Sequence, residues 1–239
     1  MRSIRVKPVH RHVTRFWSEE RSLTAFLILL IVEIFIIAPM QTRGLAVILF
    51  NNMVFFLLLM TGLMTMTKRK ALQALLAMVV VLAIATRCAT LVLKVPGLEV
   101  LDGIFMLLCI IGFLVIVLWE VYREGPVTVH RIQGAVAAYL LLSILFAVAY
   151  SLLEHLHPGS FQTPSAVEEY GGRVSRSFYY FSVVTLTTTG FGDITPVSPF
   201  ARTLTMMEAL VGQLYPAILI ARLVSLHVES KRGKRTEHD

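Results

Sequence analysis

The stretch that decides the fold is TLTTTGFGD, from Thr185 to Asp193. Gly190 and Gly192 are separated by one residue, and glycine reaches backbone dihedrals with φ > 0 without the steric penalty of a Cβ atom. In a soluble chain the stretch could form an ordinary turn. Here an aromatic and β-branched run at 176–188 is too short to span a membrane, and apolar segments of spanning length lie on both sides. The pattern predicts a re-entrant element, which is tolerated at membrane depth where protein surrounds it.

The composition is that of a multispanning membrane protein. Of the 239 residues, 56% are hydrophobic and 15% are charged, and the mean hydropathy is positive. These values exclude a soluble domain of this size. Cys88 and Cys109 both fall inside apolar segments, so we interpret them as small core hydrophobes rather than a disulfide or a metal site. No nucleotide motif, metal cluster or nucleophile–base pair in the sequence indicates an enzyme.

Six apolar segments have the ~20 residues that a helix needs to cross the hydrocarbon core. They lie near 22–40, 45–67, 71–93, 98–120, 132–153 and 200–226. Residues 155–175 carry prolines, glycines and charged residues, which indicates an exposed loop. We therefore expect an all-α membrane protein with six transmembrane helices plus a re-entrant helix and loop.

The placement of lysine and arginine predicts the orientation, because cytoplasmic segments of membrane proteins carry an excess of both. With the N-terminus inside, sixteen of the 22 lie in cytoplasmic segments and five in outer segments. This predicts a plasma-membrane protein with cytoplasmic N- and C-termini, and it places TLTTTGFGD at the outer side.

The run Thr188-Thr189-Gly190-Phe191-Gly192, followed by Asp193 and preceded by Thr185 and Thr187, resembles the selectivity filter of potassium channels. In that family, backbone carbonyls replace the hydration shell of K+. One loop supplies one quarter of each oxygen ring, so the resemblance implies a homotetramer. It also implies K+ sites at Thr188, Thr189, Gly190 and Phe191. The Thr188 hydroxyl would lie at the cytoplasmic end, and Phe191 would wedge outward against the preceding helix.

Residues 178–184 fit the pore helix of the same family, which aims the partial negative charge of its C-terminal end at a water-filled cavity. Family members often carry two tryptophans where Tyr180 and Phe181 stand, so these two residues would form an aromatic cuff around the filter. We expect the hydroxyl of Tyr180 or of Thr189 to make hydrogen bonds behind the filter. A pairing of Tyr180 with Asp193 is also possible.

The chain departs from the family pattern at three positions. Val184 stands where some members have a glutamate that pairs with the filter aspartate, so Asp193 needs another partner or solvent. Thr189 replaces a valine or isoleucine, and its hydroxyl must be satisfied if it is buried. Phe191 replaces a tyrosine whose hydroxyl braces the filter. No carbonyl is lost, so K+ selectivity is still expected. The predicted filter support comprises Asp193, Tyr180, Phe181, Val184, Thr185 and Thr187.

The last span carries three candidate pore residues. Gly212 lies 22 residues after Gly190, a spacing that resembles the hinge glycine of the family, with close helix packing as the alternative. Pro216 removes a backbone donor and should kink the helix. Gln213 is polar in an apolar span, so we expect it to face the central cavity. The candidate inner-gate residues are Ala221, Val224, Ser225 and Val228.

Four spans before a pore domain resemble the layout of voltage-gated channels. A voltage sensor needs several charges in the field, because each contributes only ~2.3 kcal/mol per 100 mV. Residues 103–119 contain no charged residue, so the sequence predicts no steep voltage gating through this span.

Three ionisable residues, Glu33, Arg87 and Asp102, fall in the outer third of the first four spans, at a depth that Asn51 and Asn52 share. A charge in lipid normally faces the bundle interior with a partner, so we expect Arg87 to pair with Glu33, Asp102 or both. The cluster is either a polar clasp that fixes helix packing or a site for a small ligand, a proton or weak voltage sensing.

The link at 121–131 is short and is broken by Gly125 and Pro126, so we expect each four-helix unit to pack beside the pore of its own subunit. At the other end of the chain, Lys231–Arg235 is a candidate site for anionic lipid headgroups.

The sequence thus predicts a homotetrameric potassium-selective channel, with K+ as the permeant ion and without a cofactor. A non-conducting regulatory subunit and a non-selective cation channel are the alternatives. The predicted domains are a basic cytoplasmic N-terminus (1–21), a four-helix transmembrane domain (22–122), a pore domain (132–228) and a basic cytoplasmic tail (229–239).

Overall fold

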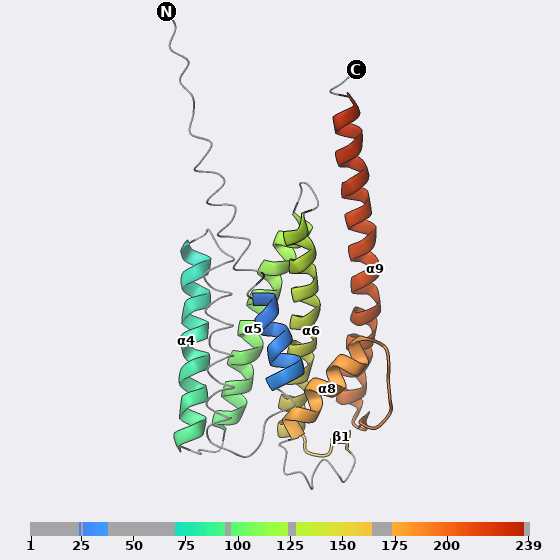
Figure 1. The fold of residues 1–239 in the computed structure, drawn as a ribbon. Coiled ribbons are helices and arrows are strands. Elements are labelled where there is room, and N and C mark those ends of the chain that lie inside the picture. Colours follow the sequence, from blue (N-terminus) through green and yellow to red (C-terminus); the bar gives the residue numbers. More distant parts are fainter. Residues whose placement is uncertain are drawn as a thin grey trace, which may run out of the picture.

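The computed structural model describes residues 24, 26–37, 70–93, 97–123, 128–163 and 174–236, which are almost entirely helical (Figure 1). The helices are α4 (Lys70–Leu93), α5 (Leu98–Tyr122), α6 (Val129–Leu156), α8 (Val174–Leu186) and α9 (Pro199–Thr236). Residues 26–32 are α-helical and continue into a π-helical turn, η1 (Glu33–Ile37). The two described strands are β1 (Phe161–Gln162) and β2 (Thr195–Pro196).

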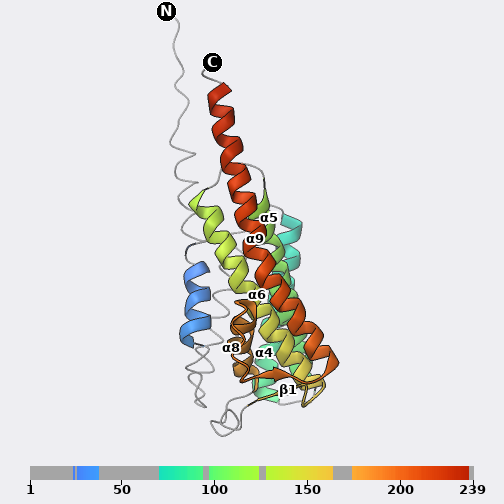
Figure 2. The same cartoon turned by 90° about the vertical axis from the view of Figure 1, so that its right-hand side faces the viewer.

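Helices α4, α5 and α6 run side by side, and the short α8 packs between α6 and α9 near one end of the bundle (Figure 1, Figure 2). The C-terminal part of α9 extends past α5 and α6 on the side away from α8 (Figure 1). Strand β1 pairs antiparallel with β2. The segment after α6 is therefore tied to the segment before α9.

Three described helical segments are long and apolar enough to cross a membrane: Leu98–Tyr122, Val129–Leu156 and Pro199–Ser225. They coincide with the fourth, fifth and sixth predicted spans. Helix α4 coincides with the third and has an apolar part at Leu76–Thr90. The second predicted span, 45–67, lies outside the described residues, so the six-span layout stays a prediction. The loop expected from residue 155 begins later, because α6 continues to Leu156.

Helix α6 is the centre of the described bundle and packs against α5, α8 and α9. Its buried residues include Ala135, Ala137 and Ala138, and small side chains let membrane helices approach closely. On α5, a Cβ added to Gly103 would lie 3.2 Å from the Leu152 side chain of α6. Helix α5 thus lies beside α6 of its own chain, as the short link predicts, whereas the arrangement of subunits stays a prediction.

The helix at 26–37 joins the bundle through α5 and α6. The rings of Phe26 and Phe113 are both buried, with centroids 6.5 Å apart. The Thr24 hydroxyl donates to Oε1 of Gln133 at 3.1 Å. Glu33 lies seven residues after Phe26, which places both on the same helix face, and it is only 2% exposed. Its carboxyl group is therefore directed into the bundle.

An ion pair connects α4 and α5 within the predicted polar cluster. Nη1 of Arg87 lies 2.6 Å from Oδ2 of Asp102, which confirms Asp102 as a partner of Arg87. Glu33 is within electrostatic reach of Arg87, but its buried Oε2 has no hydrogen-bond partner in the described part of the chain. Asn51 and Asn52 lie outside the described residues.

We predict that Asp102→Asn lowers the thermal stability of the detergent-solubilised protein. The Arg87 guanidinium would lose its charge partner while remaining partly out of water, and breaking one side of such a pair costs more than the intact pair contributes. Unfolding midpoints followed by circular dichroism measure the effect.

Glu120→Gln is the matched control for this variant. Glu120 and Arg123 are 3.9 Å apart and 64% and 65% exposed, and exposed pairs contribute only ~0–1 kcal/mol. A midpoint for Asp102→Asn no lower than that for Glu120→Gln would rule out a stabilising ion pair.

Candidate functional site

The loop after α8 follows an alternating backbone path. Thr188, Gly190 and Gly192 have φ values of 58°, 57° and 79°. The positive φ predicted for the two glycines is confirmed, and Thr188 adopts it as well, which the sequence did not predict. A non-glycine residue in this region costs on the order of 1–2 kcal/mol. The surrounding structure must therefore hold Thr188 in place.

The amides of this loop are turned back toward the end of α8. The Val184 carbonyl accepts from the N–H of Thr189 at 2.9 Å and from that of Gly190 at 3.4 Å. The N–H of Thr188 donates to the Thr185 carbonyl at 2.9 Å. These bonds satisfy carbonyls that a helix leaves unpaired at its C-terminus. The bonds use the N–H groups of residues 188–190, and no carbonyl of residues 188–192 accepts a backbone hydrogen bond among the described residues.

Two threonine hydroxyls connect the helix end to the loop. Oγ1 of Thr187 donates to the Val183 carbonyl at 2.8 Å. Oγ1 of Thr189 lies 2.9 Å from Oγ1 of Thr187. Because Thr187 gives its only hydrogen to Val183, Thr189 must be the donor between them. The Thr189 hydroxyl thus has a partner at the start of the loop, whereas a hydrogen bond behind the filter stays a prediction.

Phe191 and Tyr180 stack on each other, with ring centroids 6.4 Å apart and ring planes 4° from parallel. Phe191 therefore lies against α8, as expected, whereas its outward direction depends on the assembly and stays a prediction. The Tyr180 hydroxyl is close enough to the Asp193 carboxylate for an electrostatic interaction. The pairing of Tyr180 with Asp193 itself stays a prediction.

The expectation of a two-residue aromatic cuff is wrong for Phe181. Its ring is buried and lies 5.1 Å from that of Tyr150 and 5.7 Å from that of Phe161, centroid to centroid. Neighbouring residues of an α-helix point in directions about 100° apart, so Tyr180 and Phe181 cannot both face the loop. Phe181 supports α8 from the side of α6.

Helix α9 approaches the end of α8 at Gly212. A Cβ there would lie 2.0 Å from the carbonyl oxygen of Leu186, and the same oxygen accepts from the Tyr139 hydroxyl of α6 at 2.9 Å. Close packing thus accounts for this glycine, whereas its role as a hinge stays a prediction. Helix α9 continues through Pro216, which leaves the Gly212 carbonyl without its usual helical donor.

The other predicted pore residues of α9 lie on the surface of the single chain. Gln213, Ala221, Val224 and Ser225 are exposed. Exposure fits residues that line a cavity or a gate, and it equally fits residues that face lipid or another subunit. The side chains of Val228 and of Lys231–Arg235 lie outside the described residues.

Tyr179 of α8 is near enough to Glu33, Arg87 and Asp102 for an electrostatic interaction with each of them. The polar cluster therefore lies in the neighbourhood of α8.

The turn between α6 and β1 is held by Glu154. Its carboxylate accepts from the N–H of Gly159 at 2.7 Å and from that of Phe161 at 3.1 Å. The carbonyl of Ser160 in this turn accepts from the N–H of Val197 at 2.8 Å. The segment that leads from the loop into α9 is thereby anchored to α6.

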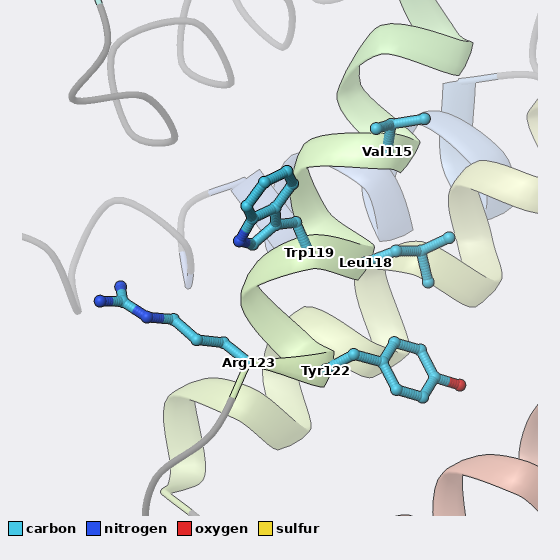
Figure 3. A pocket seen from close by; sticks show the side chains of 5 residues that line it. All are labelled: Val115, Leu118, Trp119, Tyr122 and Arg123. Carbon is cyan, nitrogen blue, oxygen red and sulfur yellow. The ribbon is translucent and has the colours of Figure 1, made fainter.

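A shallow apolar hollow lies at the C-terminal end of α5, away from the loop (Figure 3). Its lining residues are Val115, Leu118, Trp119, Tyr122 and Arg123. Tryptophan, tyrosine and arginine at a helix end are typical of the membrane–water interface. We therefore interpret the hollow as lipid-facing surface.

One buried polar residue of the pore region, Glu208, was missed in the sequence. It is 0% exposed and contacts the hydroxyls of Tyr150 and Ser182. A signal was present, because Glu208 is the one acidic residue of the predicted span at 200–226. An ionisable residue within a span usually has a specific partner and a role.

A family model described as "Ion channel" matches residues 138–229, which include most of α6, all of α8 and the loop, and α9 to its last turns. The inward rectifier potassium channel Kirbac3.1 of Paramagnetospirillum magnetotacticum is 35% identical over 97 residues, which cover 39% of this chain and 27% of that protein. The Protein LctB of Bacillus caldotenax is 34% identical over 111 residues, which cover 45% of this chain and 81% of LctB.

A probable potassium channel protein 2 of Methanocaldococcus jannaschii is 44% identical over 52 residues, which cover 22% of this chain and 15% of that protein. The chain thus spans most of LctB but only about a quarter of Kirbac3.1. No solved structure matches it. Because the matched region includes the helix pair, the pore helix and the loop described above, and four fifths of LctB align with it, the chain belongs to the potassium channel family.

Proposed function

We propose that this chain is one subunit of a homotetrameric, K+-selective channel that conducts K+ passively across the cell membrane. The observation that carries the proposal is the alternating path at 188–192, in which the amides of residues 188–190 bond to carbonyls at the end of α8. The carbonyls of the path would then bind the cation. K+ is the permeant ion, and it would pass the carbonyls of Thr188, Thr189, Gly190 and Phe191 without the help of a cofactor.

The selectivity comes from replacing water by protein oxygens. A K+ ion that enters the filter exchanges its hydration shell for rings of carbonyls. One chain has one loop, so four chains around an axis supply each ring. The exposure of the loop supports this assembly, since every residue from 187 to 193 is exposed in the single chain. Phe191 alone is 69% exposed, and neighbouring subunits would cover it.

The surface of α9 also supports an assembly. Its large exposed apolar residues include Met206, Met207, Leu210, Leu214, Ile218 and Ile220. At about 100° per residue they fall on one broad side of the helix, which the rest of the chain leaves uncovered. In a tetramer, one face of α9 would meet the neighbouring subunit and another would line the cavity. Gln213 would face that cavity.

The remaining parts of the proposal concern layout and gating. Six spans with both termini in the cytoplasm place the filter at the outer side. Gating would bend α9 near Gly212 and Pro216, close an inner gate at Ala221, Val224, Ser225 and Val228, and respond to anionic lipid at Lys231–Arg235. Steep voltage gating is not part of it, because residues 103–119 are uncharged and Arg87 is already paired with Asp102.

We predict that the purified chain, reconstituted alone in liposomes, conducts K+ with a reversal potential near the K+ equilibrium potential under a K+–Na+ gradient. The physical reason is that a carbonyl ring fitted to K+ dehydrates Na+ less favourably. Planar-bilayer recordings or a flux assay with imposed membrane potential measure it.

Two other results would each contradict a part of the proposal. A reversal potential near zero would indicate a non-selective cation channel. Absence of current from a correctly assembled tetramer would indicate a non-conducting subunit that needs another channel.

We also predict that Gly190→Ala reduces selective K+ flux about 5- to 30-fold. Gly190 has φ of 57°, and an alanine there costs on the order of 1–2 kcal/mol, which shifts a two-state population by about that factor. Flux from liposomes with matched protein content measures the change.

Gly159→Ala is the control for backbone strain. Gly159 has φ of 84°, and a Cβ at either glycine would meet no atom within 4 Å. The same strain in the turn before β1 should lower thermal stability and leave K+ over Na+ selectivity unchanged. Equal flux from wild type and Gly190→Ala would refute a functional role of this path.

A further inference from the structure

Glu208 of α9 lies where three helices of the pore region meet. Its side chain is 0% exposed, and both carboxyl oxygens contact hydroxyl groups. The Tyr150 hydroxyl of α6 donates to Oε2, and Oε1 is in hydrogen-bond contact with the Ser182 hydroxyl of α8. The Ser182 hydroxyl also lies 2.7 Å from the main-chain carbonyl oxygen of Ser143 in α6.

These three contacts require three hydrogens. Tyr150 and Ser182 supply one each, and an ionised carboxylate supplies none. The Ser143 carbonyl can only accept. With an ionised Glu208, the Ser182 oxygen would therefore face one of its two oxygen neighbours without a hydrogen between them. A proton on Oε1 fills the gap, because Glu208 then donates to Ser182 and Ser182 donates to Ser143.

The groups around the Glu208 carboxyl also favour its protonated, neutral form. The titratable groups that face it are Tyr150 and Tyr139, both uncharged phenols of α6. From α8 it meets the hydroxyl of Ser182. None of the ion pairs among the described residues includes Glu208. A buried carboxylate without a cation is strongly disfavoured, whereas a neutral acid with all hydrogen bonds made is tolerated.

We propose that Glu208 is a neutral carboxylic acid that positions the pore helix through this chain of hydrogen bonds. Ser182 lies two residues before Val184, whose carbonyl holds the amides of Thr189 and Gly190. The acid thus fixes the part of α8 from which the loop extends. It acts through α8 and does not touch the permeant ion. Its effect on K+ flux rests on the proposed function, whereas its protonation state does not.

Infrared spectroscopy of the reconstituted protein at neutral pH tests the protonation state. The difference spectrum of wild type minus Glu208→Gln should contain the C=O stretch of a neutral carboxylic acid. The matched control is Glu154→Gln, because Glu154 accepts two backbone hydrogen bonds as an outer-loop carboxylate. Its difference spectrum should contain carboxylate bands instead. Loss of carboxylate bands in Glu208→Gln would overturn the proposal.

Substitutions at Glu208 test the positioning role through K+ flux. The amide of Glu208→Gln can donate to Ser182 and accept from Tyr150, so this variant should keep at least half of the wild-type flux. Glu208→Asp is one methylene too short to reach both hydroxyls, and Glu208→Ala has no polar group. Both leave buried hydroxyls unsatisfied and should lower the flux roughly tenfold or more.

The outcomes separate the two proposals. If Glu208→Gln loses as much flux as Glu208→Ala, the neutral hydrogen-bonding group is not what positions α8. Should the alanine variant fail to assemble, the comparison of glutamine with aspartate decides the same question. If wild type carries no selective K+ flux, the proposed function fails, and the infrared result still decides whether Glu208 carries the proton.

Discussion

The carbonyl of Val184 accepts two amide hydrogens from the loop that follows it, and the pore region is arranged around this contact. A helix ends with carbonyls that lack helical donors, and the proposed K+ path requires the carbonyls of the loop to stay free. Turning the loop amides onto the helix end meets both needs at once. The positive φ of Thr188 is the strain that this path stores. Residues that pack against the end of α8 therefore also influence the position of the loop.

Helix α8 has a different neighbour on each side, as its period of 3.6 residues requires. Tyr179 is within electrostatic range of Glu33, Arg87 and Asp102, and Tyr180 faces the loop through Phe191. Phe181 and Ser182 turn toward α6 and α9. At its end, the Leu186 carbonyl is held by Tyr139 and closely approached by Gly212. Helix α8 thus links α6 and α9 to the loop.

Local rules made some of these features predictable. The positive φ of Gly190 and Gly192 follows from sterics within single residues, and the Arg87–Asp102 pair follows from equal depth in the membrane. The positive φ of Thr188 could not be predicted in this way. A β-branched residue rarely adopts it, and here the hydrogen bonds to α8 impose it. The partners of Glu208, Tyr150 and Ser182, lie 58 and 26 residues away, and no spacing rule connects them. The sequence alone does not distinguish a glycine that allows close helix packing from one at which a helix bends, and Gly212 is such a case.

The Arg87–Asp102 pair and the Glu208 cluster differ in how deeply they are buried, and the chemistry of their partners differs accordingly. Arg87 is 41% exposed in its side chain and pairs with the Asp102 carboxylate, which balances its charge within the span. Glu208 is fully buried, where hydroxyl partners suit a neutral acid and an uncompensated charge is costly. The hydrogen bonds of Glu208 hold α8 at Ser182, three residues after Tyr179 and therefore on a neighbouring face of the same helix. Both clusters thus lie near the same part of α8, which precedes the loop.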